Sequence, residues 1–277
     1  MANRTVAHVG PSHSMGGMAA VIQNLSSNPP ENWNSIIINT HSDLGIISKI
    51  SSYFDARRRL SDLIKTKKID LIHFHVTHGF SWLRKSRLMR LVERLRVPMI
   101  IHIHSGRFEK FCSGITGFFV RRELIKTGRR VVLLEERWKE NLSNWIPNNS
   151  LVIYNSFEHK EVRLKGPAKD TIRLLHMSRD SKGKGHDFSV EVLRELISMG
   201  VDASLTMTGR ERKYPEKDIL PVEELGWVTQ ERKNELICES DFLLSPSQFE
   251  GSSMSIIESM VSGLPALVSK TSSETVS

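Results

Sequence analysis

Two glutamates separated by a short turn are the first residues in this sequence whose spacing could support chemistry. Glu250 and Glu258 stand eight positions apart in the stretch Ser245-Pro-Ser-Gln-Phe-Glu-Gly-Ser-Ser-Met-Ser-Ile-Ile-Glu258. We expect Glu250 in the turn and Glu258 on the following helix, with Gly251, Ser252 and Ser253 offering backbone N–H groups at the helix start. A helix N-terminus favours anions, and a carboxylate accepts hydrogen bonds from neighbouring sugar hydroxyls.

A second candidate is the basic segment Arg179-Asp-Ser-Lys-Gly-Lys-Gly185, which follows the apolar run Ile172–Met177. Ligands of open α/β sheets bind beyond the carboxyl ends of the strands. There Arg179 could bind a diphosphate as a planar fork and Lys184 as a point charge. A solvated basic turn is the alternative interpretation of the same residues.

Glycines and histidines form the remaining candidates. Gly16-Gly17 lies between a short β-rich run, 5–9, and a helical pattern, 18–25, where glycine lets the backbone approach a phosphate. A plain turn explains the pair equally well, and the absent G-x-G-x-x-G spacing counts against a dinucleotide oxidoreductase. Five histidines lie on or just after two apolar runs: His73, His75, His78, His102 and His104. We expect them to be held by hydrogen bonds and to bind no metal.

Alternating strands and helices would position all of these residues. Continuous apolar runs such as 69–75 and 97–104 are typical of parallel strands buried on both faces. The series begins again at residue 172, after a polar segment, 156–170, that contains Gly166-Pro167 and that we interpret as a linker. The sequence therefore predicts two Rossmann-like α/β domains, 1–158 and 171–277, with a cleft between them.

Composition excludes several classes of protein. The 277 residues are 39% hydrophobic and 25% charged, as in ordinary globular proteins. Two cysteines are too few for a disulfide framework or a cysteine-based zinc cluster. No apolar run approaches the ~20 residues of a membrane span, and the first residues do not have the pattern of a signal peptide.

Positive charge is concentrated in the first half of the chain. Residues 1–160 carry 24 basic and 12 acidic side chains, whereas residues 161–277 carry 15 and 19. The predicted helix 81–96 has six basic residues and one acid. We expect it either to pack on its own sheet or to lie on an anionic membrane surface through Trp82, Arg84, Lys85, Arg87 and Arg90. No recognised motif accompanies the charge, so we do not expect nucleic-acid binding.

Taken together, these motifs resemble the large retaining glycosyltransferase family 4. The resemblance is carried by Glu250-x7-Glu258 after Ser-Pro-Ser, with Arg179-x4-Lys184-Gly185 upstream, and it extends along nearly the whole chain. It implies the GT-B architecture of two Rossmann-like domains and transfer of a sugar from a nucleotide-sugar, usually without a metal or another cofactor. Family members continue for roughly another hundred residues, so the resemblance also implies an incomplete second domain.

The resemblance assigns a role to each matching position. Arg179 and Lys184 would hold the donor diphosphate and stabilise the leaving nucleotide. Glu258 would bind the ribose, Glu250 the donor sugar, and the backbone of Gly251, Ser252 and Ser253 would lie near both. Val228 would contact the base through its backbone, Gly17 would close on the phosphates from the first domain, and His104 would touch the donor sugar. Ser178 and Ser253 depart from glycines that are common in the family.

The expected partners are a nucleotide-sugar, most simply a UDP-sugar, and a glycan or lipid-linked acceptor for surface polysaccharide or glycolipid synthesis. The expected location is the cytoplasm, with possible attachment at the inner face of the membrane. Three alternatives remain at this point: an inactive or purely nucleotide-binding remnant, a sugar-nucleotide epimerase, and a glycoside hydrolase with paired carboxylates. The turn-helix position of the glutamates and the phosphate-binding neighbours count against the hydrolase.

Overall fold

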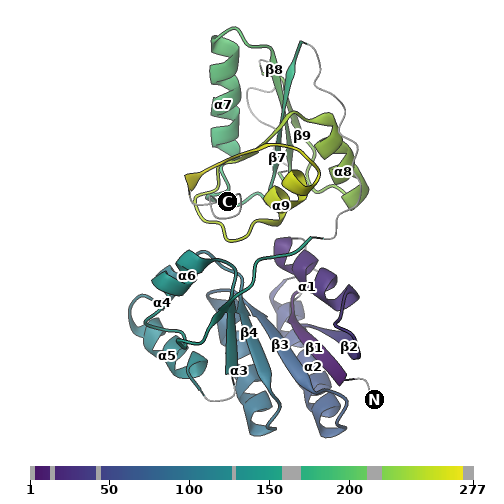
Figure 1. Ribbon diagram of the computed structural model, residues 1–277, viewed down its shortest axis with the longest axis vertical. Coiled ribbons are helices and arrows are strands. Elements are labelled where there is room, and N and C mark those ends of the chain that lie inside the picture. Colours follow the sequence, from purple (N-terminus) through teal and green to yellow (C-terminus); the bar gives the residue numbers. More distant parts are fainter. Residues whose placement is uncertain are drawn as a thin grey trace. The chain divides into compact units, whose positions relative to one another are not determined.

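A computed structural model describes residues 4–12, 16–41, 45–126, 129–157, 170–210 and 220–270. The chain divides into two compact units, Met1–Ser156 and Phe157–Ser277, which we call unit 1 and unit 2 (Figure 1). Most of the predicted linker, 158–169, lies outside the described residues. Each unit contains its own parallel sheet, as the continuous apolar runs predicted.

Unit 1 has six strands in the order β2-β1-β3-β4-β5-β6. The strands are β1 (Arg4–Gly10), β2 (Trp33–Asn39), β3 (Leu71–Val76), β4 (Met99–Ile103), β5 (Arg129–Leu133) and β6 (Leu151–Val152). Every neighbouring pair is parallel. Because parallel strands end at one edge of the sheet, the residues that follow β1, β3 and β4 lie at the same edge.

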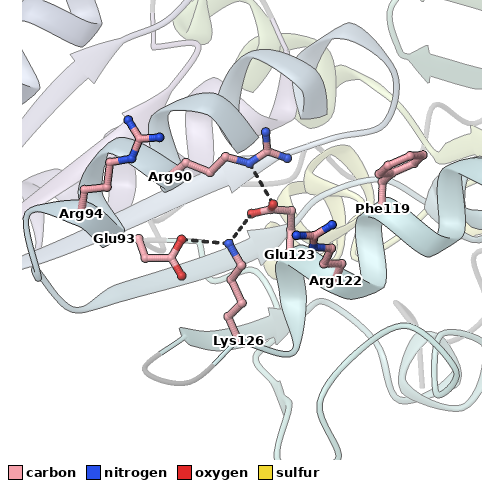
Figure 2. Close-up of a pocket in the computed structure, with 7 residues that line it drawn as sticks. All are labelled: Arg90, Glu93, Arg94, Phe119, Arg122, Glu123 and Lys126. Carbon is pink, nitrogen blue, oxygen red and sulfur yellow. Dashed lines mark hydrogen bonds and ion pairs between the residues drawn. The ribbon is translucent and has the colours of Figure 1, made fainter.

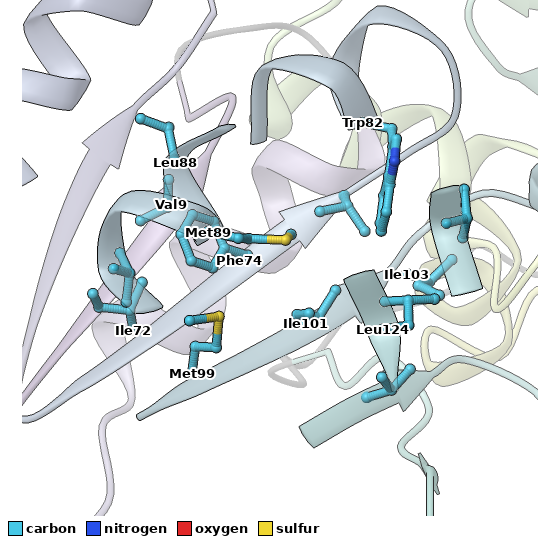
Figure 3. Close-up of a cluster of buried hydrophobic side chains, with 14 of the residues drawn as sticks. Val9, Ile72, Phe74, Trp82, Leu88, Met89, Met99, Ile101, Ile103 and Leu124 are labelled. Atoms are coloured by element: carbon cyan, nitrogen blue, oxygen red, sulfur yellow. The ribbon is translucent and has the colours of Figure 1, made fainter. Parts of the chain in front are cut away.

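Helices connect these strands. They are α1 (Gly17–Ser27), α2 (Ile46–Lys65), α3 (Phe80–Arg94), α4 (Phe108–Cys112), α5 (Ile115–Leu124) and α6 (Glu136–Asn141). Helices α2, α3 and α5 contribute Leu60, Leu88 and Leu124 to one large apolar core that also contains Phe74 and Ile101 of the sheet (Figure 3). The short helices α4, α5 and α6 were not predicted from the sequence.

Unit 2 has five strands in the order β11-β10-β7-β8-β9. They are β7 (Ile172–Met177), β8 (Ala203–Thr208), β9 (Val222–Glu224), β10 (Phe242–Ser245) and β11 (Ala266–Val268), again all parallel. The helices are α7 (His186–Ser198), α8 (Gln230–Glu239) and α9 (Met254–Val261). β7 and β10 are neighbours, so the basic segment and the glutamate segment both begin at the carboxyl edge of adjacent strands.

Strand β7 separates two apolar cores in unit 2. Leu174 packs with Val190 of α7 and Leu205 of β8 on one side. Leu175 packs with Leu236 of α8 and Ile256 of α9 on the other. The alternation along one strand holds α7 on one face of the sheet and α8 and α9 on the other. The α/β fold with two parallel sheets therefore confirms the predicted fold class.

Candidate functional site

The loops after β7 and β10 bring Lys184 and Glu250 together. The Lys184 Nζ atom forms an ion pair with Glu250 Oε1, and the two side chains are 27% and 12% exposed. These residues are 66 positions apart in the sequence. The structure therefore places two of the predicted site residues in one partly buried, polar cluster at the carboxyl edge of the unit 2 sheet.

Glycines hold the Lys184 loop against the neighbouring loop. Gly183 and Gly185 have φ values of 95° and 81°, in the left-handed region that favours glycine. The backbone N–H of Gln248 donates to the Gly183 carbonyl oxygen at 2.8 Å. A Cβ atom on Gly185 would lie 2.7 Å from Pro246 Cγ. Both glycines are thus needed for the close packing that directs Lys184 towards Glu250.

Glu258 lies on α9 and is paired with a residue that the sequence analysis did not identify. Lys233 of α8 forms an ion pair with Glu258 Oε2, and the Glu258 side chain is only 3% exposed. Removing one partner of a buried ion pair leaves the other charge uncompensated. Lys233 therefore belongs to the candidate site, although nothing in the spacing of the sequence pointed to a contact between helices α8 and α9.

The Ser252–Ser253 segment forms the turn into α9. Ser252 is buried and has a positive φ of 46°, which is uncommon for a residue other than glycine. Ser253 is buried and precedes the first residue of α9, whose first turn holds no acidic residue. The partial positive charge of this helix end is therefore available to an anion. Gly251, immediately before, is half-buried.

Arg179 and Val228 complete the predicted residues of unit 2. Arg179 follows β7 and is exposed, and the next residue, Asp180, donates its N–H to the Gly209 carbonyl oxygen at 3.0 Å. Val228 is partly buried against the core that contains Leu175. Residues after β7, β9 and β10 and at the start of α9 therefore surround the same carboxyl edge of the sheet.

Gly17 and His104 belong to unit 1. Gly17 is the first residue of α1, after Gly16 with a φ of 141°. His104 directly follows β4, and its backbone N–H donates to the Val76 carbonyl oxygen at 2.8 Å. Both residues thus follow strands at the carboxyl edge of the unit 1 sheet, as the apolar runs predicted.

Imidazole rings from three strands gather next to His104. His8 Nδ1 lies 3.2 Å from His75 Nε2, and His75 Nδ1 lies 3.0 Å from His104 Nε2. Burial lowers the pKa of His8 to about 4 and that of His104 to about 3, so both rings are neutral at pH 7. His8 was not singled out from the sequence, although it points to the same face of the sheet as the other rings.

The prediction that hydrogen bonds satisfy the histidines is only partly correct. The chain His8–His75–His104 and the contact of His78 Nδ1 with Ser105 Oγ at 2.6 Å agree with it. Both ring nitrogens of His102 are buried without a hydrogen-bond partner within the described ranges. The nitrogens of His75, His102 and His104 lie within 4.8 Å of one another, so the absence of a metal stays a prediction.

Helix α3 corrects the proposed membrane surface. Trp82 is 3% exposed and belongs to the buried apolar cluster (Figure 3). It packs edge-on against Phe108 at a ring-centroid distance of 5.4 Å. Lys85 is 1% exposed. Arg87 and Arg90 are exposed, and Arg90 Nε is bonded to Glu123 Oε1 at 2.9 Å. The five residues therefore do not share a face. Trp82 and Lys85 lie on the apolar stripe of α3 and are buried, whereas Arg87 and Arg90 are exposed.

A basic pocket of about 500 Å³ lies between α3 and α5. Its lining includes Arg90, Glu93, Glu123 and Lys126, which are joined by ion pairs, and Phe119 stands at its side (Figure 2). No helix in the described ranges has the length and apolar character needed to cross a membrane. The charges of this pocket largely serve to hold α3 and α5 together.

Comparison with known proteins gives a family match for the second half of the chain. Residues 171–277 match the family model described as glycosyl transferases group 1. The GDP-mannose-dependent α-(1-6)-phosphatidylinositol dimannoside mannosyltransferase of Mycobacterium tuberculosis is 33% identical over 109 residues, which cover 38% of this chain and 29% of that protein. EpsF of Bacillus subtilis, provisionally named a glycosyltransferase, is 24% identical over 276 residues, which cover 95% of this chain and 68% of EpsF.

Solved structures resemble the fold of the whole chain. HepE of Anabaena in complex with UDP-glucose has a TM-score of 0.65 at 14% identity, covering 96% of this chain and 80% of HepE. A sucrose-phosphate synthase of Thermosynechococcus elongatus has the same TM-score and identity, with 96% and 81% covered. The chain therefore has a GT-B type α/β fold, and its residues 171–277 match the glycosyl transferases group 1 model.

Proposed function

We propose that this protein is a retaining glycosyltransferase that moves a sugar from a nucleotide-sugar to a glycan or lipid-linked acceptor, in the synthesis of a surface polysaccharide or glycolipid. The observation that carries the proposal is the two ion pairs Lys184–Glu250 and Lys233–Glu258, formed by loops and helices that follow the carboxyl ends of the unit 2 strands. Cytoplasmic location is part of the same proposal.

The residues of unit 2 supply what a nucleotide diphosphate requires. Arg179 and Lys184 would bind the diphosphate and stabilise the charge that develops on the departing nucleotide. The N-terminal end of α9 would add backbone N–H groups and a partial positive charge. These groups neutralise the diphosphate without a metal, so we propose that transfer requires no metal cofactor.

The two glutamates would recognise hydroxyl groups. Each carboxylate is paired with a lysine. A donor diphosphate would compete for Lys184, which would free Glu250 to accept hydrogen bonds from the sugar. Glu258 would accept from the ribose while Lys233 fixes its orientation, and the backbone of Val228 would contact the base.

Unit 1 would contribute Gly17 to the phosphates and His104 to the donor sugar. The hydrogen bond between His75 Nδ1 and His104 Nε2 would hold the orientation of the His104 ring. HepE is described in complex with UDP-glucose, and the mycobacterial enzyme is named as GDP-mannose-dependent. We favour a UDP-sugar because the resemblance to HepE covers nearly the whole chain.

The test is turnover of radiolabelled UDP- and GDP-sugars by the purified chain with extracted glycans and lipids as acceptors. Lys184→Met and Glu258→Gln should each lower turnover at least ~100-fold, because a charge-assisted contact is lost in both. Lys182→Met is the matched control, since this exposed lysine lies in the same loop, and it should retain activity. Retention is tested separately by proton NMR of the product, which should have the anomeric configuration of the donor.

Full activity of Lys184→Met or Glu258→Gln would overturn the assignment. Nucleotide binding without any turnover would support the alternative of a binding protein. Consumption of the donor without acceptor, yielding an isomeric nucleotide-sugar, would indicate an epimerase instead.

A further inference from the structure

A lysine buried without an acidic partner marks a second polar site, in unit 1. Lys85 lies on α3, one turn from its N-terminal end, and is 1% exposed. Its Nζ atom bonds to Ser81 Oγ at 3.0 Å, and no ion pair of Lys85 occurs among the described residues. Buried cations are normally paired because desolvation of an isolated charge is costly.

The neighbouring arginine shows the same lack of compensation. The Nε atom of Arg84 is buried and has no hydrogen-bond partner in the described segments, while its Nη2 atom contacts His41 Nδ1 at 3.3 Å. Burial lowers the pKa of Arg84 and lowers that of Lys85 to about 7. Burial disfavours the charged form of both side chains. A bound anion would offset this cost, so the two residues indicate a candidate anion site.

The surrounding groups at this edge of the sheet are cationic or neutral donors. His104 follows β4, and Lys85 is close enough to contribute to the lowered pKa of His104. His78 and Ser105 are hydrogen-bonded to each other at 2.6 Å. Burial and the charge of Arg107 both lower the pKa of His78. A buried carboxylate after β5, Glu135, is paired with Arg137 at 2.7 Å and so does not balance Lys85.

The start of α3 adds to this potential. Gly79 precedes the helix with a φ of 65°, no side chain caps it, and its first turn has no acidic residue. The partial positive charge of the helix end therefore has the same sign as Arg84 and Lys85. Ser81 and His104 are half-buried and His78 is exposed, so the rim of the site is reachable although the Lys85 amine is not exposed.

We propose that this site, formed by Arg84 and Lys85 with Ser81 and His104 at its rim, binds a phosphoryl group of the acceptor. The identification of the ligand as the acceptor rests on the proposed function. The proposal of an anion site does not. A phosphoryl group matches the donors present: a guanidinium fork, an ammonium point charge and a hydroxyl. The phosphoryl group belongs either to a lipid-linked acceptor or to a water-soluble phosphorylated sugar.

The experiment uses phosphate itself as the probe, in the full chain. The Lys184→Met background removes the phosphate-binding lysine of unit 2. Inorganic phosphate should raise the thermal midpoint of this variant relative to chloride at equal ionic strength, because a ligand of the folded state stabilises it. Adding Lys85→Met should weaken the phosphate affinity, fitted from the midpoint shifts, at least tenfold.

Two further variants guard the interpretation. Adding Arg87→Met is the matched control, because Arg87 is an exposed cation two positions along the same helix, and it should leave the phosphate affinity unchanged. Arg84→Gln changes the second cation of the site, a partly exposed side chain, and should also weaken the affinity at least tenfold. An unchanged affinity in Lys85→Met or Arg84→Gln, or no response to phosphate in the Lys184→Met background, overturns the proposal.

The source of the phosphoryl group is resolved by two arms. Glycerol 3-phosphate tests a soluble phosphate. Vesicles of phosphatidylcholine with about 20 mol% phosphatidic acid test a lipid headgroup. Lys85-dependent binding in one arm identifies that source and supports the proposal. If the chain does not bind a nucleotide through Lys184 but its response to phosphate still depends on Lys85, only the transfer proposal is overturned. If nucleotide binding depends on Lys184 but the response to phosphate does not depend on Lys85, only the acceptor-site proposal is overturned.

Discussion

Lys85 shows how a single residue changes meaning once its burial is known. Its position in a basic helix of the sequence suggested that it lies on a membrane-binding surface. In the structure it is a buried amine whose pKa is lowered to about 7. Lys85 stands three and seven positions before Leu88 and Val92, so it lies on the buried apolar stripe of α3, whereas Arg87 lies on another face of the helix. The basic composition of the helix suggested one exposed surface, but the position of each residue relative to the stripe decides which side chain is buried.

The lowered pKa of Lys85 predicts a pH dependence of stability. The unfolded chain, with a lysine pKa near 10.5, binds the proton more tightly than the folded chain at about 7. Stability should therefore rise with pH across this window, and Lys85→Met should remove that rise and stabilise the protein at pH 7 by up to about 5 kcal/mol. Urea unfolding of both proteins in phosphate-free buffer at pH 7 and pH 9.5 measures the difference.

A smaller stability gain at pH 9.5 than at pH 7 is the expected result. An equal effect of Lys85→Met at both pH values would show that the pKa of the Lys85 amine is not lowered in the folded protein. Arg84 and His104 act on the same amine, so both must be left unchanged in this comparison.

The two cysteines should react at very different rates. Cys112 is buried and its pKa is raised to about 12 by burial and by Glu109, whereas Cys238 is partly exposed. Since the thiolate is the reactive form, a disulfide reagent at pH 8 should label Cys238 in the native protein and Cys112 only after unfolding. Mass spectrometry of the wild type and Cys238→Ser checks this, and rapid labelling of native Cys112 would contradict the packing of α4.

At the scale of elements, the sequence predicted the strands better than their connections. Long apolar runs such as β3 and β4 are recognisable because parallel strands are buried on both faces. The three-residue strand β9 and the short helices α4 to α6 have too few residues for a clear period and are held by their neighbours. The ion pairs of Glu250 and Glu258 were also out of reach, since sequence spacing does not report which loops meet.

The loop after β7 offers a prediction about positioning. Gly185→Ala introduces a Cβ atom at 2.7 Å from Pro246 and a side chain at a φ of 81°, at a cost of about 1–3 kcal/mol. We expect the Lys184 loop to separate from the β10 loop, so donor affinity should fall while the far-UV circular dichroism of the chain is retained. Gly200→Ala is the control, because Gly200 has the same φ of 81° with no atom within 4 Å of the added Cβ.

Gly200→Ala should therefore cost stability through backbone strain alone and leave donor affinity unchanged. Equal losses of donor affinity in Gly185→Ala and Gly200→Ala would show that the contact with Pro246 does not position Lys184. Differential scanning calorimetry and nucleotide titration of the three proteins provide both readouts.

At the scale of the whole molecule, charge and chemistry divide between two units. Unit 2 carries the paired lysines and glutamates at the edge of its sheet. Among the described residues of unit 1, Lys85 forms no ion pair and the buried Nε atom of Arg84 has no hydrogen-bond partner. Two parallel sheets, each with its own core, were predictable from the alternation of apolar runs. The asymmetry of charge was visible in the sequence as well, but its localisation in a buried site required the packing of α3.

The most direct test of the account is a calorimetric titration of the purified chain with UDP and GDP, repeated with Lys184→Met and Lys182→Met. The account predicts saturable binding of a nucleoside diphosphate by the wild type and by Lys182→Met, and at least a tenfold loss of affinity in Lys184→Met. Absence of binding to both nucleotides, or binding that Lys184→Met leaves intact, would contradict it.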